Sequence, residues 1–199
     1  CTPPTELLRR RMADASEGSR GRTVRRTKPF WESKPKKLVA KPNKARPGFD
    51  DNRTVFGAIL RGELPATVYL EDDRVLAFAD IAPACANHIL IIPKKHITRV
   101  SALTPDDLAL LRHMVEVAAR ACGGDLAEMR RAGTLALGFH HPFITVSHLH
   151  LHVVWPLPAR SCLDRLKFPE SGATTTSCFF MTPEDASERY CRAPLIEPA

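Results

Sequence analysis

The sequence predicts an α+β fold with an antiparallel sheet of about five strands, one long helix and one short helix. The predicted elements follow one another in the order helix, three strands, long helix, two strands. Few of the connections are long enough for the crossovers that parallel strands require, which favours antiparallel pairing. With 199 residues, 44% of them apolar, the chain is long enough for one such domain plus extensions.

The first predicted elements are a short helix and three strands. Residues 54–65 place apolar side chains at helical spacing, and Gly62 marks the end of this helix. Residues 67–73 and 75–80 predict two strands joined by a tight acidic turn. Residues 88–93 are a continuous apolar run closed by a proline, which predicts the third strand.

Residues 104–124 have the strongest helical signal in the chain. Thr104 is a good cap and Pro105 suits the first turn, while two glycines end the segment. Two further strands are predicted at residues 134–139 and 148–154.

Charge and apolar content divide the chain into three parts. Residues 1–48 hold 14 Lys and Arg against 4 Asp and Glu, and their few apolar residues predict a disordered basic arm. Residues 49–160 are the predicted folded domain. Residues 161–199 form a C-terminal extension without a recognisable role, although 177–181 and 182–190 resemble a short strand and a capped helix.

Composition limits the compartment and the class of protein. No stretch approaches the roughly 18 consecutive apolar residues of a membrane span. The six cysteines are scattered, which fits a reducing compartment better than a disulfide framework. We therefore expect an intracellular protein, cytoplasmic or nuclear. Organelle targeting or nucleic-acid binding by the basic arm stays open, and the first residue, Cys1, leads us to expect a fragment or a processed product.

The segment HLHLHVVW, residues 148–155, places histidines at every second position. On a strand His148, His150 and His152 share one face, while the apolar residues between them face the core. Such a row can bind a metal ion, or it can act on phosphorus as acid, base or nucleophile. Burying three histidines without partners is costly, so a purely structural role is disfavoured. The local pattern leaves metal and phosphoryl chemistry open.

Longer motifs favour phosphoryl chemistry. Residues 148–154 match His-φ-His-φ-His-φ-φ, where φ is apolar, and this is the defining pattern of the histidine triad (HIT) family of nucleotide-binding proteins. The segments at 56–81 and 79–97 also resemble that family, in its Hint branch. LGFHHPF at 137–143 resembles the third Hint type, an adenosine 5′-monophosphoramidase, more than the first. The resemblance covers about residues 50–160 and implies the HIT-like fold.

The resemblance implies a reaction and roles for four histidines. Family members bind a nucleoside monophosphate and cleave a bond at its α-phosphorus, here the P–N bond of a purine nucleoside phosphoramidate. By motif position His150 is the nucleophile that forms a nucleotidyl-histidine intermediate. His152 binds the phosphate and assists proton transfer, His148 orients the nucleophile, and His88 completes the site.

The resemblance also implies contacts with the nucleotide. Asp80 would pair with the ribose hydroxyls, Ile81 would pack on the base, and Thr145 would lie near the phosphate. His140 or His141 is expected to replace a polar contact, because Leu137 or Gly138 stands where the first Hint type has an asparagine. No cofactor is implied.

Some bacterial relatives have a zinc site at the first helix, built on a Cys-x-x-Cys. Thr54 and Gly57 stand at these two positions, so no metal is predicted.

The expected partners are a purine nucleotide and a second copy of the chain. A homodimer would pair the sheets and the long helices. Their apolar stripe at Leu108, Leu111, Val115 and Ala119 offers surface for this packing, and the same stripe could instead serve the protein's own core. One alternative is a HIT hydrolase of dinucleoside polyphosphates or capped RNA ends, with the basic arm contacting RNA phosphates. Another is a non-catalytic, nucleotide-sensing adaptor, which would not require an intact triad.

Overall fold

The computed structural model describes residues 36–38, 48–49, 51–123, 125–157, 168 and 179–195. The strands are β1 (Lys36–Leu38), β2 (Ala66–Glu71), β3 (Val75–Ala79), β4 (Asn87–Pro93), β5 (Ala136–His140), β6 (Leu151–Trp155) and β7 (Phe180–Met181). The helices and helical turns are α2 (Val55–Arg61), η2 (Val100–Ala102), η3 (Pro105–Asp107), α3 (Leu108–Cys122), α4 (Leu126–Arg131), α6 (Pro183–Ala186) and η4 (Ser187–Cys191).

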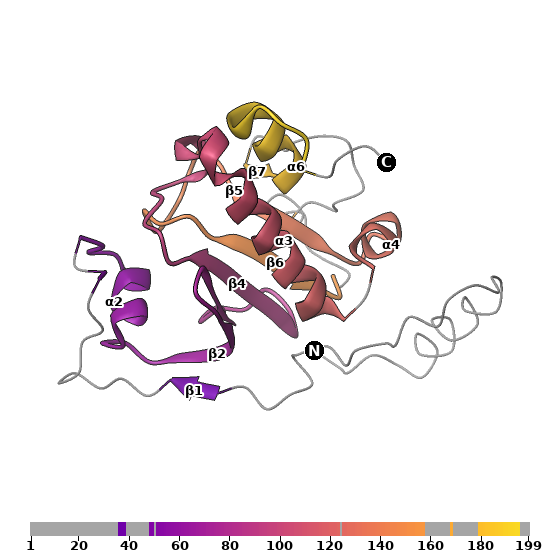
Figure 1. Cartoon of the computed structure of the whole chain (residues 1–199). Helices are drawn as coiled ribbons and strands as arrows, with labels where there is room; N and C mark the ends of the chain where they lie inside the picture. Colours follow the sequence, from indigo (N-terminus) through magenta and orange to yellow (C-terminus); the bar gives the residue numbers. More distant parts are fainter. Residues whose placement is uncertain are drawn as a thin grey trace.

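The strands of the described residues form one antiparallel sheet in the order β1-β2-β3-β4-β6-β5-β7 (Figure 1). This confirms the predicted α+β class, and β2 to β6 are the five strands that the sequence indicates. Strands β1 and β7 extend the sheet at its two edges. None of the helices described here is long and apolar enough to cross a membrane.

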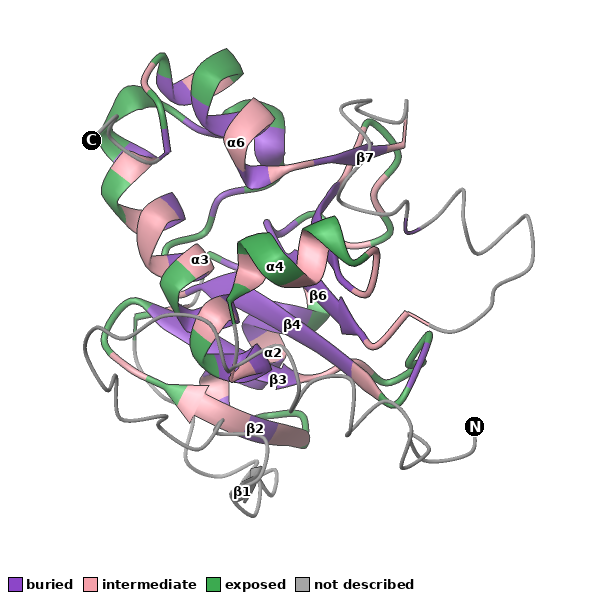
Figure 2. Ribbon diagram, turned by 90° about the vertical axis from the view of Figure 1, so that its right-hand side faces the viewer, coloured by how far each residue is buried: buried purple, intermediate pink, exposed green. Residues whose placement is uncertain are grey.

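The two faces of the sheet have different partners. The long helix α3 covers one face, where Leu111 and Met114 are fully buried against the sheet. The short helix α2 packs on the other face through Phe56, Ile59 and Leu60. Strands β4 and β6 lie buried in the middle of the sheet (Figure 2). Side chains on the α2 face of β4 and β6 are therefore enclosed and can form a site.

Capping explains where both helices begin and end. The Thr54 hydroxyl accepts the Gly57 N–H at the start of α2, and Gly62 ends α2 in the left-handed conformation that glycine favours. Thr104 and Asp107 form a reciprocal capping box before α3. The helix predicted at 104–124 is thus the turn η3 followed by α3.

The histidine strand begins later than predicted. The sequence places its start at residue 148, whereas β6 begins at Leu151. Its partner β4 ends at Pro93, which has no N–H to donate, and the last pair in the ladder is Ile91 with Leu151. Residues 148–150 keep the predicted alternation, because Leu149 packs in the α3 core while the histidines face the other way.

Part of the predicted basic arm is ordered. Residues 36–38 form β1 and pair with β2, which corrects the expectation of disorder for these three residues. An edge strand offers unpaired N–H and C=O groups to any extended segment, so pairing here does not require apolar side chains. The rest of residues 1–47 lies outside the described part of the chain.

The apolar stripe expected at a homodimer interface packs within the protein. Leu111 is fully buried in the core, and Leu108 and Val115 pack against the same core. The stripe therefore contributes to the protein's own core, although Leu108, Val115 and Ala119 are only half-buried, and the homodimer stays a prediction.

Candidate active site

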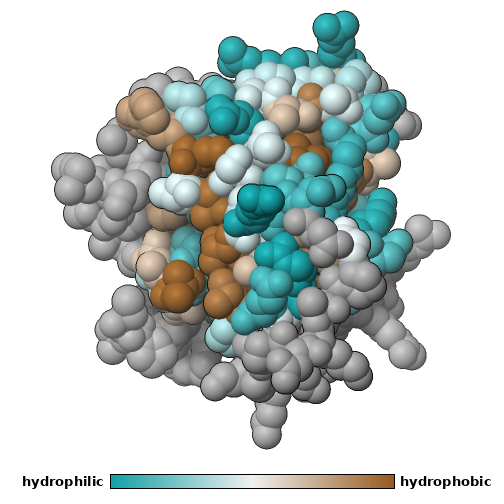
Figure 3. Space-filling model, turned by 90° about the vertical axis from the view of Figure 1, so that its left-hand side faces the viewer, coloured by the Kyte–Doolittle hydropathy of each residue, from teal (hydrophilic) through white to brown (hydrophobic). Residues whose placement is uncertain are grey.

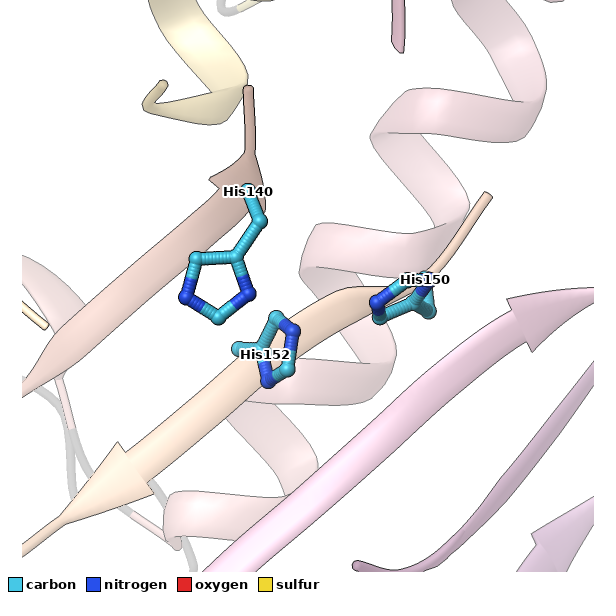
Figure 4. Close-up of side chains that lie close together, drawn as sticks. All are labelled: His140, His150 and His152. Atoms are coloured by element: carbon cyan, nitrogen blue, oxygen red, sulfur yellow. The ribbon is translucent and has the colours of Figure 1, made fainter. Parts of the chain in front are cut away.

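Four histidines meet on the α2 face of the sheet, three from neighbouring strands and His150 from the segment just before β6. His152 of β6 lies at the centre, with ring centroids at 4.3 Å from His140 of β5, 4.9 Å from His150 and 5.2 Å from His88 of β4. The rings of His140, His150 and His152 converge on one space (Figure 4). The sheet register produces this cluster. His152 is paired with Leu90 of β4, which lies two residues from His88 on the same face, and with Gly138 of β5, which lies two residues from His140.

His148 is fully buried beside the cluster, and its hydrogen bonds hold the neighbouring His150 in position. Its Nδ1 accepts a hydrogen bond from the Asn52 amide at 2.6 Å, so its proton lies on Nε2, which donates to the Pro93 carbonyl at 2.9 Å. Both ring nitrogens are therefore occupied by the protein. The His148 carbonyl in turn accepts the Nδ1–H of His150 at 2.7 Å. The backbone of His148, and not its ring, orients the predicted nucleophile.

The hydrogen bond to the His148 carbonyl fixes the tautomer of His150. Because Nδ1 carries the proton, the neutral ring has a lone pair on Nε2. This is the atom that a nucleophilic imidazole uses. His150 is also held by the edge of Phe56 from α2, at a centroid distance of 5.3 Å.

A second chain of hydrogen bonds fixes His152. The Ala84 N–H donates to His88 Nδ1 at 3.1 Å, so the proton of His88 lies on Nε2. His88 Nε2 then donates to His152 Nδ1 at 2.9 Å, which leaves the proton of His152 on its own Nε2. That Nε2–H is buried and has no hydrogen-bond partner among the described residues. A buried donor in this state needs an acceptor, and a ligand oxygen would supply one.

Burial keeps these rings neutral. It lowers the pKa of His148 to about 4, and it is also the largest cause that lowers the pKa values of His88, His150 and His152. For His152, the imidazoles of His150, His140 and His88 lower the pKa further, since neighbouring positive charges would repel one another. Neutral rings are the state in which the hydrogen-bond chains above can form.

The structure brings some of the predicted nucleotide-binding residues to the cluster and not others. Asp80 Oδ2 lies 3.5 Å from His88 Nε2, and His140 is part of the cluster. Ile81 is fully exposed, and Thr145 is exposed in the loop before His148. A small pocket beside the cluster is lined by residues that include Arg99, His140, Ile144, His148 and His150.

The side of the molecule that carries α2 has an apolar surface. Figure 3 shows a band of apolar side chains on this side, bordered by hydrophilic ones. The large apolar side chains that are exposed among the described residues are Val55, Leu64, Ile81 and Phe143.

Two groups that contact the cluster were not identified from the sequence. Asn52 precedes α2 and gives no motif signal. Phe168 and Phe180 come from the C-terminal extension, and their rings lie 5.2 Å and 5.5 Å from His140. A single aromatic residue in a segment without periodicity offers no sign that it will reach a site elsewhere in the chain.

The cluster also holds donors of the type that bind divalent cations. Ring nitrogens of His140, His150 and His152 lie within 4.8 Å of one another, and so do the ligand atoms of Asp80, His88 and His152. The donor set suits zinc in type. However, His88 Nε2 and His152 Nδ1 already bond to each other, so the second group would have to break that hydrogen bond.

Comparisons with known proteins place the chain in a family. Residues 53–165 match the family model described as "Scavenger mRNA decapping enzyme C-term binding". An uncharacterized HIT-like protein, slr1234 of Synechocystis, is 41% identical over 109 residues, which are 53% of this chain and 91% of that protein. The adenosine 5′-monophosphoramidase HINT3 of Danio rerio is 38% identical over 109 residues, 53% of this chain and 66% of that protein.

Among solved structures, a HIT family hydrolase from Clostridium thermocellum is 32% identical, with a TM-score of 0.47, over 55% of this chain and 95% of that one. The fold and the buried histidine row define a protein of the histidine triad type. The chain belongs to the histidine triad family, since the family model covers more than half of it and the relative from Synechocystis is matched over most of its length.

Proposed function

We propose that the chain hydrolyses the P–N bond of purine nucleoside 5′-phosphoramidates, as an adenosine 5′-monophosphoramidase. One observation carries the proposal: the His150 Nε2 lone pair and the His152 Nε2–H, which has no partner among the described residues, belong to adjacent rings in one buried cluster. A nucleophile and a hydrogen-bond donor are what displacement at phosphorus requires. The HINT3 relatives, which carry this activity in their names, support it.

In the proposed reaction, His150 Nε2 attacks the α-phosphorus and forms a P–N bond to the enzyme. The leaving nitrogen takes a proton from solvent, its bond to phosphorus breaks, and it departs as an amine with the electron pair. Water then attacks the same phosphorus and gives up a proton to solvent, which releases the nucleoside monophosphate and restores His150. The His152 Nε2–H would bind a non-bridging oxygen of the phosphate, and His152 would assist these proton transfers, while the polar rings around it stabilise the transition state.

Other residues are proposed to hold the nucleotide. Asp80 would bind the ribose hydroxyls, and its position beside His88 supports this role. His140 would contact the phosphate, since its ring lies next to that of His152. Ile81 would cover the base and Thr145 would contact the phosphate, and the exposure of both leaves them accessible to a ligand. A homodimer and nucleic-acid contacts of the basic arm are further proposals, to be tested by sedimentation and by RNA binding.

Intact-protein mass spectrometry after brief incubation with adenosine 5′-phosphoramidate tests the proposal. We expect a nucleotidyl adduct or AMP release with the wild type and with His113→Ala, a control histidine on α3 that contacts Asp72. His150→Ala should show neither. Equal AMP release by wild type and His150→Ala would overturn covalent catalysis through His150.

The description of the matched family model favours one alternative, a hydrolase of capped RNA ends or dinucleoside polyphosphates. There the leaving group is a phosphate and not an amine. Comparing kcat/KM for adenosine 5′-phosphoramidate, a cap dinucleotide and diadenosine triphosphate would separate the two reactions. Tight AMP binding without turnover of any of them would instead support the adaptor.

A further inference from the structure

The C-terminal extension reaches the candidate active site through β7. This strand pairs with the end of β5, with Phe180 opposite His140 and Met181 opposite Phe139. The pairing continues as the His141 N–H donates to the Phe179 carbonyl at 3.0 Å. Strand β7 lies beyond the residues that match the family model, 53–165, so this contact is a feature of the chain's own extension.

The Phe180 ring fills the space above Gly138. A Cβ atom at Gly138 would lie 2.5 Å from a ring carbon of Phe180, so only glycine permits this approach. Gly138 is paired with His152 in the sheet, and the ring therefore lies next to His152, at a centroid distance of 6.4 Å. The Phe180 ring occupies the side-chain space that any other residue at Gly138 would take.

A second aromatic ring completes this side of the cluster. Phe168 lies 5.9 Å from Phe180, and it contacts His88, His140 and His152 at 5.3, 5.2 and 5.5 Å. Phe56 of α2 holds His150 from another side. The central ring, His152, is fixed by a hydrogen bond at Nδ1 only, because its Nε2 has no partner in the described residues. Packing must then set the direction in which Nε2–H points.

We propose that Phe180 is a positioning residue, which holds the rings of His140 and His152 in place and keeps water from the Nε2–H of His152. Strand β7 of the extension thereby completes the site. The activity part of this proposal rests on the proposed function, whereas the effect on the histidine rings does not.

The groups that face His152 determine how its titration would respond. They are His88 from β4, His140 from β5 and His150 from the segment before β6, with Asp80 acting through His88. None of these groups is itself removed when Phe180 is replaced. Removal of the ring admits water to His152, which reduces the penalty on its charged form and raises its pKa.

The experiment compares Phe180→Ala and Phe180→Leu with Met181→Ala. Neighbours on a strand point to opposite faces, and Met181 is buried in the α3 core, whereas Phe180 packs with Phe168. Met181→Ala therefore creates a cavity in the same strand without touching the cluster. Histidine NMR titration, kcat and KM for adenosine 5′-phosphoramidate, and thermal melting are measured for each variant.

We expect Phe180→Ala to raise the titration midpoint of His152 by roughly one pH unit and to lower kcat by about tenfold or more. Phe180→Leu should show a smaller change of the same sign. Met181→Ala should lower the melting temperature but leave both the titration and kcat close to wild type. If Phe180→Ala and Phe180→Leu titrate like Met181→Ala, the positioning role is wrong, whatever the turnover. If the His152 midpoint shifts as expected while the wild type has no turnover, the positioning of His152 stands and the proposed function fails.

Discussion

Asn52 and His148 lie 96 residues apart in the chain and are joined by a hydrogen bond of 2.6 Å from the amide Nδ2 to the imidazole Nδ1. The Asn52 Oδ1 accepts the hydroxyl and N–H of Thr54, the residue that caps α2. One buried amide therefore links the start of α2 to the histidine segment. Because the His148 carbonyl orients His150, the position of Asn52 affects the proposed nucleophile through two hydrogen bonds.

Replacing Asn52 with Ala leaves His148 Nδ1 buried without a donor. We expect a loss of about 1–3 kcal/mol in the free energy of unfolding, the usual cost of an unsatisfied buried group. Urea denaturation measures it, with Asn87→Ala, at a half-buried amide of β4, as the control. Equal losses in the two variants would mean that the bond to His148 contributes nothing specific.

Gly57 accommodates the close approach of Asn52. A Cβ at residue 57 would collide with the Asn52 carbonyl oxygen and lie 2.6 Å from Asn52 Cγ. Inside a helix Ala is ordinarily more stable than Gly by roughly 0.5–1 kcal/mol, but here the collision should dominate. We expect Gly57→Ala to destabilise the protein by about 1–3 kcal/mol, a typical cost of overpacking, as measured in urea. A gain in stability would contradict the tight contact.

The sequence predicts the histidine row because alternation is a local property of a strand. The five central strands and the long helix are predicted for the same reason, since their apolar periods and caps lie within each segment. The tautomers of His88 and His152 are beyond such reasoning, because they depend on the Ala84 N–H and on a contact between two strands. Asn52 and Phe180 are likewise brought to the cluster by tertiary packing.

Lowering the pH from neutral towards 4 should destabilise the protein, because histidines that are neutral in the folded state become protonated on unfolding. The pKa of His148 is about 4 in the folded protein against 6.5 ordinarily. The unfolded chain therefore binds the proton first as the pH falls, and stability is lost progressively from about pH 6.5 down to about pH 4. Between about pH 7.5 and 5.5 the share of His148 is about 1 kcal/mol. Urea denaturation at both pH values should give a smaller difference for His148→Gln than for wild type or His113→Gln. An unchanged difference in His148→Gln would show that His148 is already protonated, or equally protonated, in both states.

At the start of α3, Asp107 takes part both in the capping box with Thr104 and in an ion pair with Lys95. Substitutions can test which of the two contributes more to the stability of the protein. The buried Asp107 carboxylate accepts the Thr104 N–H at 3.0 Å, the Thr104 hydroxyl at 2.8 Å and the Lys95 Nζ at 2.6 Å. Burial raises the pKa of Asp107, but these contacts together lower it below its ordinary value. The Lys95 side chain is 62% exposed, so water screens its charge.

We therefore expect Asp107→Ala to cost about 2–3 kcal/mol, because the Thr104 N–H and hydroxyl lose their acceptor and the capping box loses its reciprocal half. Lys95→Ala should cost less than about 1 kcal/mol, as is usual for an exposed ion pair. The losses are measured by urea denaturation at low and high salt. A Lys95→Ala loss as large as that of Asp107→Ala, and strongly reduced by salt, would assign the stabilisation to the ion pair instead of the capping box.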